Sequence, residues 1–150
     1  MTPGTLVLVG PGWAGVAEAL RSYGWAALAG IDDASVPSAA LAVGTARPEP
    51  PLVLVGRGPS AALLPGLAGA QRAACRAVGG YVFVDAELTM DREHDHLPVD
   101  WPDAPCGYLR TGAEPASSAR QARVAELRGW PVRTAGDDLA AALRELVLSL

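Results

Sequence analysis

Short apolar runs alternate with helical segments along the whole chain, and this alternation constrains the fold more than any other feature. Thr5–Val9 and Leu52–Val55 are almost continuously apolar, as strands covered on both faces of a parallel sheet are. Alternating β and α units predict a parallel sheet with helices on both faces and right-handed crossovers. We therefore expect one three-layer α/β domain over all 150 residues.

The bounds of the expected elements follow from hydrophobic period and from residues typical of segment ends. The strands are expected at Thr5–Val9, Ala26–Ile31, Leu52–Val55, Tyr81–Val84, Gly107–Arg110 and Pro131–Arg133. The helices are expected at Trp13–Tyr23, Ser38–Val43 (with Ser38 as one candidate cap), Ser60–Ala77, Pro115–Arg128 and Asp137–Leu148. The polar, proline-rich stretch Glu87–Pro105 predicts a long loop, and such loops on compact domains are often functional.

Composition narrows the choice of partner and compartment. The net charge is −4, which gives no reason to expect a nucleic-acid partner. No segment resembles a signal peptide or is apolar for long enough to span a membrane, so we expect a cytoplasmic protein without a membrane partner. Cys75 and Cys106 form no Cys-x-x-Cys pair and are expected to be buried free thiols.

The turn after the third strand is the most informative motif. Gly56-Arg57-Gly58-Pro59-Ser60 follows an apolar strand and precedes a helical run. A strand, a sharp glycine-rich turn and a helix form the setting of a hydrolase nucleophile elbow. The elbow needs Ser, Cys or Asp directly after the strand turn, and here that position holds Gly58. The turn therefore has the surroundings of a nucleophile without the nucleophile.

The order of the elements resembles the α/β-hydrolase fold with its first hairpin removed. The segments similar to its elbow and later strands are Leu52–Gly58, Gly80–Ala86, Pro105–Arg110 and Arg128–Arg133. The resemblance implies a six-stranded, mainly parallel sheet in the order 2-1-3-4-5-6, with the usual lid cut down to the Glu87–Pro105 loop. It also implies that Asp85, at the end of the fourth strand, stands at the position of the catalytic acid.

The same resemblance implies an incomplete hydrolytic apparatus. Pro59 follows the nucleophile position and has no N–H for an oxyanion hole, where one donor is worth ~3 kcal/mol of barrier. The family histidine lies after the last strand, and the corresponding Thr134–Asp138 contains none. We therefore do not expect a standard Ser-His-Asp hydrolase.

Ser60 has two interpretations. If the turn is shifted by two residues, the stretch from Gly58 to Ala62 approaches Gly-x-Ser-x-Gly, which makes Ser60 an esterase nucleophile and Ala61 an oxyanion donor. Serine is also a common helix N-cap, and the cap is the favoured role.

The two histidines of the chain, His94 and His96, lie among carboxylates in Asp91–His96. A His-x-His pair suits metal binding or proton transfer, with a solvated loop as the alternative. No third ligand is apparent, so we predict no metal site and take the histidines as first candidates for proton transfer. Trp13 and Trp101 are expected either to wall an apolar pocket at the strand ends or to pack in the core.

The stretch Gly10-Pro11-Gly12-Trp13-Ala14-Gly15 supports a competing interpretation. It matches Gly-x-Gly-x-x-Gly between a strand and a helix, and Asp32 follows at about the ~20-residue spacing of a dinucleotide-binding fingerprint. The same stretch also corresponds to the oxyanion loop of the hydrolase fold. A sheet in the order 3-2-1-4-5-6 would favour the dinucleotide, NAD or FAD.

The favoured function is binding of a small apolar metabolite and a cofactor-free acid–base reaction on it, such as a cyclisation, elimination or isomerisation. The residues expected to bind the metabolite are Gly12 and Trp13 through backbone N–H groups, Arg57 through its charge, Gly58 and Trp101. The residues expected to move the proton are Asp85, His94 and His96.

Three alternatives stay open: a non-catalytic binding or partner protein, a dinucleotide-binding protein, and an esterase that uses Ser60. A homodimer is expected because the last helix, Asp137–Leu148, and the shortened lid leave apolar surface uncovered.

Overall fold

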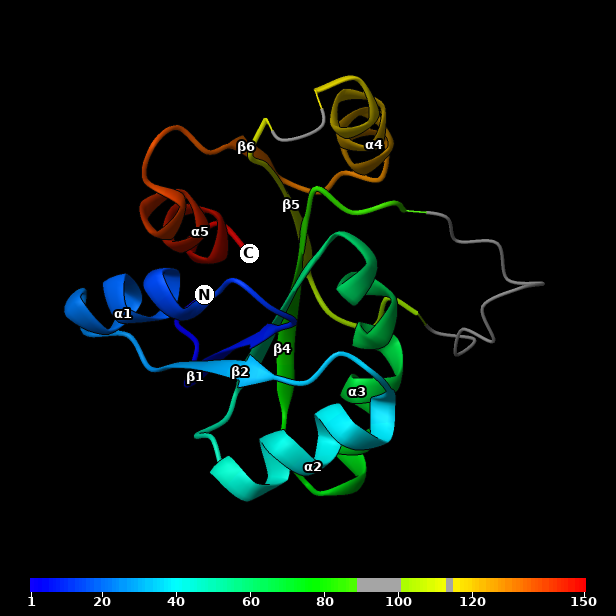
Figure 1. Cartoon of the computed structure of the whole chain (residues 1–150). Coiled ribbons are helices and arrows are strands. Elements are labelled where there is room, and N and C mark those ends of the chain that lie inside the picture. The colour runs from blue at the N-terminus through cyan, green and yellow to red at the C-terminus, as the bar shows by residue number, and fades with distance from the viewer. Residues whose placement is uncertain (89–100, 113–114) are drawn as a thin grey trace.

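The computed structural model describes residues 1–88, 101–112 and 115–150. It contains a six-stranded parallel sheet in the order β2-β1-β3-β4-β5-β6, which confirms the predicted fold class and strand order (Figure 1). The strands are β1 (Thr5–Val9), β2 (Ala27–Ile31), β3 (Leu52–Arg57), β4 (Val78–Val84), β5 (Cys106–Arg110) and β6 (Val132–Thr134). The helices are α1 (Ala14–Ser22), α2 (Val36–Ala46), the 3₁₀ helix η1 (Gly58–Leu63), α3 (Leu64–Ala73), α4 (Pro115–Leu127) and α5 (Leu139–Leu148).

Both faces of the sheet are covered, as the near-continuous apolar strands predict. Leu6 and Leu8 of β1 belong to a core cluster with α1 and α5, whereas Val7 and Val9 belong to a second cluster with α2, α3 and α4. The residues of β1 alternate between the two clusters because successive side chains of a strand point to opposite faces of the sheet. In Figure 1, α1 and α5 lie together on one side of the sheet and α3 on the other.

Two helix starts differ from the predictions. The N-cap of α2 is Ser35, whose Oγ accepts the backbone N–H of Ser38 at 3.2 Å, so Ser38 lies inside the helix rather than capping it. The segment after β3 begins as the 3₁₀ helix η1 and becomes an α-helix at Leu64. Proline at the start of η1 fixes its own φ and has no N–H to donate, which suits a first turn.

The end of α3 also differs, and with it the environment of one cysteine. The helix ends at Ala73, and Cys75 has a left-handed φ of +61°. Cys75 is exposed, which contradicts the expectation that it is buried, whereas Cys106 is buried as expected. The four residues that follow Ala73 connect the helix to β4, which begins at Val78, three residues earlier than predicted.

The closing helix α5 buries most of its apolar face against the rest of the domain. Leu143 and Leu146 are fully buried against the sheet, and Leu148 is 49% exposed. The large exposed apolar side chains of the described residues are scattered, namely Tyr23, Leu41, Leu127 and Leu148. The apolar surface expected on the last helix is therefore largely covered by the sheet. Most of the Glu87–Pro105 loop, on which the expected homodimer also rested, lies outside the described residues, and the homodimer stays a prediction.

Candidate functional site

The connections that leave β1 and β3 diverge at the carboxyl edge of the sheet. These two strands are neighbours, with Val9 opposite Gly56. The chain leaving β1 enters α1 on one face, and the chain leaving β3 enters η1 and α3 on the other. Open α/β sheets bind ligands at such a point. Four predicted binding residues lie in the two connections or at the end of β3, namely Gly12, Trp13, Arg57 and Gly58.

Arg57 and Trp13 join the two connections by a direct contact. The guanidinium carbon of Arg57 lies 4.2 Å from the centre of the Trp13 ring, a cation–π distance. The tryptophan is 1% exposed, and its Nε1 donates to the carbonyl of Val9 at 2.9 Å. The guanidinium therefore rests on a wall that belongs to the hydrophobic core.

The charge of Arg57 is not neutralised within residues 1–88, 101–112 and 115–150. Its Nε is buried and has no hydrogen-bond partner there. By contrast, Arg72 forms a salt bridge with Asp103, and Arg123 forms one with Glu126. A buried donor without a partner costs about 1–3 kcal/mol, so the fold holds this side chain in place at a cost to stability.

The turn after β3 has the tight geometry that its glycines predict. Gly58 has a left-handed φ of +54°, which glycine adopts without the steric penalty of other residues. A Cβ on Gly56 would lie 2.7 Å from the Cα of Ala61. Glycine at position 56 therefore lets η1 approach the end of β3, and the strand–turn–helix predicted from the elbow motif is present.

Ser60 is neither a helix cap nor an exposed hydroxyl. It is the third residue of η1, whose N-cap is Arg57, so its predicted role as a cap is wrong. Ser60 is 6% exposed, and its Oγ donates to Oδ2 of Asp33 at 2.8 Å. Sequence reasoning missed Asp33 as a partner because it lies 27 residues away in the loop after β2.

Asp85 lies directly after β4 with a left-handed φ of +47°. Its Oδ1 accepts the backbone N–H of Thr111 at 3.0 Å and the hydroxyl of Ser118 at 3.3 Å. Its Oδ2 accepts the hydroxyl of Thr111 in a short hydrogen bond. Thr111 lies in the β5–α4 connection and Ser118 in the first turns of α4, so Asp85 ties the end of β4 to the start of α4. Neither Thr111 nor Ser118 was singled out from the sequence, because their pairing with Asp85 depends on strand order.

Trp101 does not share a pocket with Trp13. It packs edge-on against Tyr81, with ring centroids 4.4 Å apart, on the α2–α3–α4 face of the sheet, whereas Trp13 lies on the α1–α5 face. The Tyr81 hydroxyl is also held between Arg72 and Asp103, and burial raises the pKa of this phenol well above its ordinary value. The core-packing alternative is therefore right for both tryptophans, and the shared apolar pocket is wrong.

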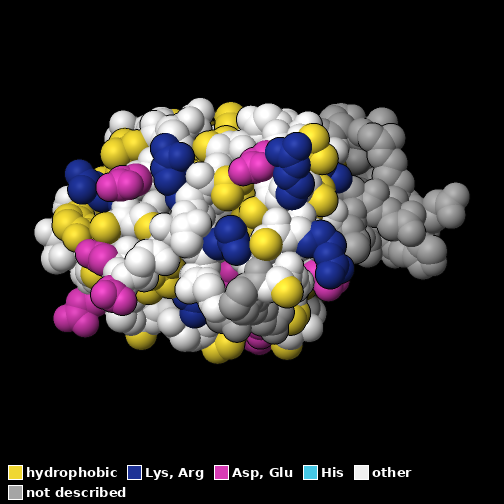
Figure 2. Space-filling model, turned by 90° about the horizontal axis from the view of Figure 1, so that it is seen from above, with side chains coloured by type: hydrophobic (Ala, Val, Ile, Leu, Met, Phe, Trp, Pro, Cys, Tyr) yellow, Lys and Arg dark blue, Asp and Glu magenta, His cyan; other side chains and the backbone are white. Residues whose placement is uncertain are grey.

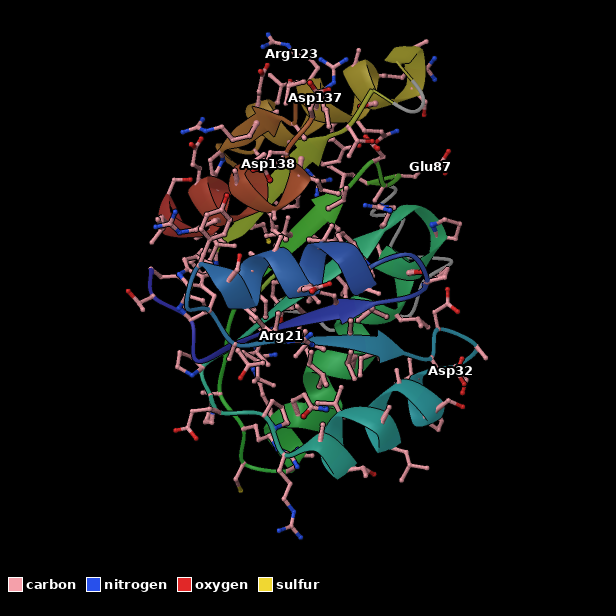
Figure 3. All side chains as sticks on the ribbon, turned by 60° about the vertical axis from the view of Figure 1, so that its left-hand side comes forward. Arg21, Asp32, Glu87, Arg123, Asp137 and Asp138 are labelled. Atoms are coloured by element: carbon pink, nitrogen blue, oxygen red, sulfur yellow. The ribbon has the colours of Figure 1, made fainter. Side chains whose placement is uncertain are left out.

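The loop after β1 matches only part of a dinucleotide-binding site. Gly10 and Gly12 have left-handed φ values of +95° and +83°, as a tight turn requires. The third glycine of that fingerprint allows close packing of helix on strand, but a Cβ on Gly15 would meet no atom of the described residues outside its own helix within 4 Å. Asp32 lies exposed after β2, as Figure 3 shows, and its Oδ1 accepts the N–H of Ala34. The strand order is also not the 3-2-1-4-5-6 that would favour a dinucleotide.

His94 and His96 lie outside the described residues. Within the described part of the chain, no three His, Cys, Asp or Glu side chains gather as a metal site would need.

An open cavity of about 350 Å³ lies at the opposite edge of the sheet, where β5 and β6 begin. Its lining includes Cys106, Trp130 and Leu150. In Figure 2, which looks down from above Figure 1, the dark-blue basic side chains lie apart, with acidic and apolar ones between them.

Comparison with protein families, with characterised proteins and with solved structures finds no match to this chain. The strand order agrees with a shortened α/β-hydrolase, but its first five strands also follow the flavodoxin-like order 2-1-3-4-5. The order alone therefore does not choose between these families. None of the helices among the described residues combines the length and the apolar character needed to cross a bilayer.

Proposed function

We propose that the protein binds a small, largely apolar metabolite where the connections after β1 and β3 diverge, and that it catalyses cofactor-free acid–base chemistry there. Cyclisation, elimination and isomerisation are the reaction types that fit. The contact of Arg57 with Trp13 carries this proposal, because it sets a cation on a rigid wall at the point where α/β sheets bind ligands.

Acid–base chemistry suits this turn better than covalent catalysis. The nucleophile position holds Gly58, and Pro59 has no N–H to stabilise an oxyanion. Positioned acid–base groups alone accelerate reactions by typically about 10²–10⁴-fold. The proposed proton carriers are Asp85, His94 and His96. Polarisation of a substrate carbonyl is assigned to Arg57 and to the backbone N–H groups of Gly12 and Trp13.

Non-catalytic binding is the second candidate function, and the contacts of Asp85 favour it. Both carboxylate oxygens of Asp85 already accept hydrogen bonds from Thr111 and Ser118. A carboxylate committed to three donors holds two connections together and has less capacity to accept a substrate proton.

Titration of ¹⁵N-labelled protein with a library of neutral and charged fragments tests the location of the site. We expect saturable shifts of the amides of Gly12, Trp13 and Arg57, with those of Cys106 and Trp130 unchanged. Shifts confined to the Cys106 cavity at the opposite edge would contradict the proposal.

A fragment that binds then identifies candidate substrates for the catalytic test. Asp85→Asn, His94→Ala and His96→Ala are compared with wild type by turnover and by circular dichroism. A loss of at least about tenfold from one of them, with the fold intact, supports acid–base catalysis. Unchanged turnover in all three would sink the assignment of proton carriers, and binding without turnover would support the non-catalytic alternative.

A further inference from the structure

We propose that the ligand of this site carries an oxyanion, a carboxylate or a phosphate, which binds the Arg57 guanidinium beside Gly12. The inference rests on the location given under the proposed function and adds the chemical class of the ligand. It starts from the charge of Arg57, for which the described residues supply neither a salt bridge nor a partner for Nε. Arginine is suited to such a group because its planar N–H donors match two oxygens at once.

The guanidinium is already held in one orientation. It lies over the Trp13 ring, and that ring is fixed by burial and by its hydrogen bond to Val9. The N–H donors of a guanidinium lie at its edge, in its own plane, so contact of its face with an aromatic ring does not use them. An anion that binds this edge does not have to order a flexible side chain first, which favours affinity.

Space for the anion lies beside two glycines. A Cβ on Gly12 would find Nη1 of Arg57 at 3.6 Å and, apart from its chain neighbours, no other atom of residues 1–88, 101–112 and 115–150 within 4 Å. Among the described residues, and apart from its two chain neighbours, a Cβ on Gly58 would find no atom within 4 Å. The Nη1 end of the guanidinium therefore borders open space, and the glycine backbone around it allows close approach.

The start of α1 adds to the attraction. The N-cap residue Trp13 makes no side-chain capping hydrogen bond, and the first turn of α1 contains no acidic residue. Backbone N–H groups at such a helix start are favourable for an anion. The helix start is a secondary contribution, and the unneutralised, fixed charge of Arg57 carries the proposal.

The acidic residues after β2 limit how the ligand lies. Asp32 and Asp33 follow β2, on the other side of β1 from the strand that ends in Arg57. Asp33 is in addition occupied by the hydroxyl of Ser60. The anionic group is therefore directed toward β3, and the end of the ligand that extends toward β2 is uncharged or carries hydrogen-bond donors.

Titration with sodium phosphate and with sodium acetate, at constant ionic strength set by sodium chloride, tests the proposal on ¹⁵N-labelled protein. We expect saturable shifts of the Gly12, Trp13 and Ala14 amides. Arg57→Gln should weaken binding at least about tenfold, as loss of a charge-assisted pair implies. Arg57→Lys keeps the charge without the fork and should bind several-fold more weakly than wild type. Arg133→Gln, an exposed arginine on β6, is the matched control and should bind as wild type does.

The two anions separate the two possible ligand groups. Tighter binding of phosphate assigns a phosphate ester, and tighter binding of acetate assigns a carboxylate. The proposal is overturned if Arg57→Gln or Arg57→Lys binds the anions as tightly as wild type does. It is also overturned if neither anion gives a saturable shift up to about 100 mM. If neutral fragments still shift Gly12 and Trp13 in that case, the proposed function stands without the anion. If the anions bind through Arg57 but no reaction is catalysed, the anion proposal stands and only the catalytic part of the proposed function fails.

Discussion

The hydroxyl of Ser60 donates to Asp33 over 2.8 Å and so joins the turn after β3 to the loop after β2, across the end of β1. Gly10, at the end of β1, lies beside both partners. A Cβ there would come within 3.1 Å of the Ser60 Cβ and 3.4 Å of the Asp33 carboxylate. One hydrogen bond therefore joins the connections after β2 and β3, and a side chain at position 10 would collide with it.

The Ser60–Asp33 hydrogen bond should contribute measurably to stability. Asp33→Ala leaves a buried hydroxyl without its acceptor and should lower the free energy of unfolding by about 1–3 kcal/mol. Ser60→Ala should cost about 0.5–1.5 kcal/mol, because the exposed Asp33 regains water. Urea denaturation of both variants and of the double variant gives the coupling energy. The exposed neighbour Asp32→Ala is the control, and additive effects of the two substitutions would contradict the coupling.

Ser60 should not act as a nucleophile. Its side chain is buried within η1, and its proton is directed to Asp33 rather than to a general base. We expect no labelling by a fluorophosphonate probe beyond the level found with Ser60→Ala. Labelling that disappears in Ser60→Ala would instead support the esterase alternative.

Three glycines should respond to alanine in three different ways. Gly58→Ala should cost about 1–2 kcal/mol, because its φ is left-handed although the space around it is open. Gly56→Ala should cost more, because its Cβ would lie 2.7 Å from Ala61. Gly69→Ala, in the exposed part of α3 with open space, should stabilise by about 0.5–1 kcal/mol. Thermal denaturation ranks the three, and equal effects at positions 58 and 69 would refute the left-handed turn.

Stability should fall in alkaline solution, partly through Tyr108. Burial raises the pKa of its phenol to about 12, with the Asp85 carboxylate adding to the effect, against about 10 in an unfolded chain. Because folding raises this pKa, the phenol contributes its full share of stability below about pH 10. That contribution is lost as the pH rises toward 12. Tyr108→Phe should flatten the decline measured by urea denaturation between these pH values. The exposed Tyr23→Phe controls for the loss of one phenol, and an unchanged slope in Tyr108→Phe would refute the prediction.

The two thiols should differ sharply in reactivity. Cys75 is exposed, whereas burial raises the pKa of the Cys106 thiol to about 12. Reaction with a chromogenic disulfide reagent near neutral pH should therefore release one equivalent from the folded protein and two after unfolding. Cys75→Ser should leave almost no reaction in the folded state. Rapid reaction of folded Cys75→Ser would show that Cys106 is accessible.

Much of the fold could be predicted from the sequence because its signals are local. The bounds of β1 agree with the prediction at both ends, since five consecutive buried residues leave no ambiguity in Thr5–Val9. The strand order was predicted from a resemblance to a known fold and is confirmed. The start of β4 was missed because Gly79 and Gly80 weaken the strand signal. In the structure, a Cβ on Gly80 would meet Leu150 at 3.1 Å, a contact with a residue 70 positions away.

The contacts within the site were less predictable because they join distant segments. The motifs brought Gly12, Trp13 and Arg57 to one edge, but nothing local indicates that Arg57 stacks on Trp13, 44 positions earlier. The partners of Ser60 and Asp85 lie 26 to 33 residues away. Trp101 was misplaced for the converse reason, because its position in the sequence near a functional-looking loop says nothing about which face of the sheet it covers.

Trp13 belongs at once to the hydrophobic core and to the wall of the proposed site. Its ring cannot swing aside for an incoming molecule without breaking the packing of α1 against the sheet. Selectivity at this edge should therefore come from rejection of molecules that do not fit, rather than from adaptation to them. Replacing Trp13 with a smaller residue would admit larger ligands, but it would also lower the melting temperature because it removes a buried core side chain.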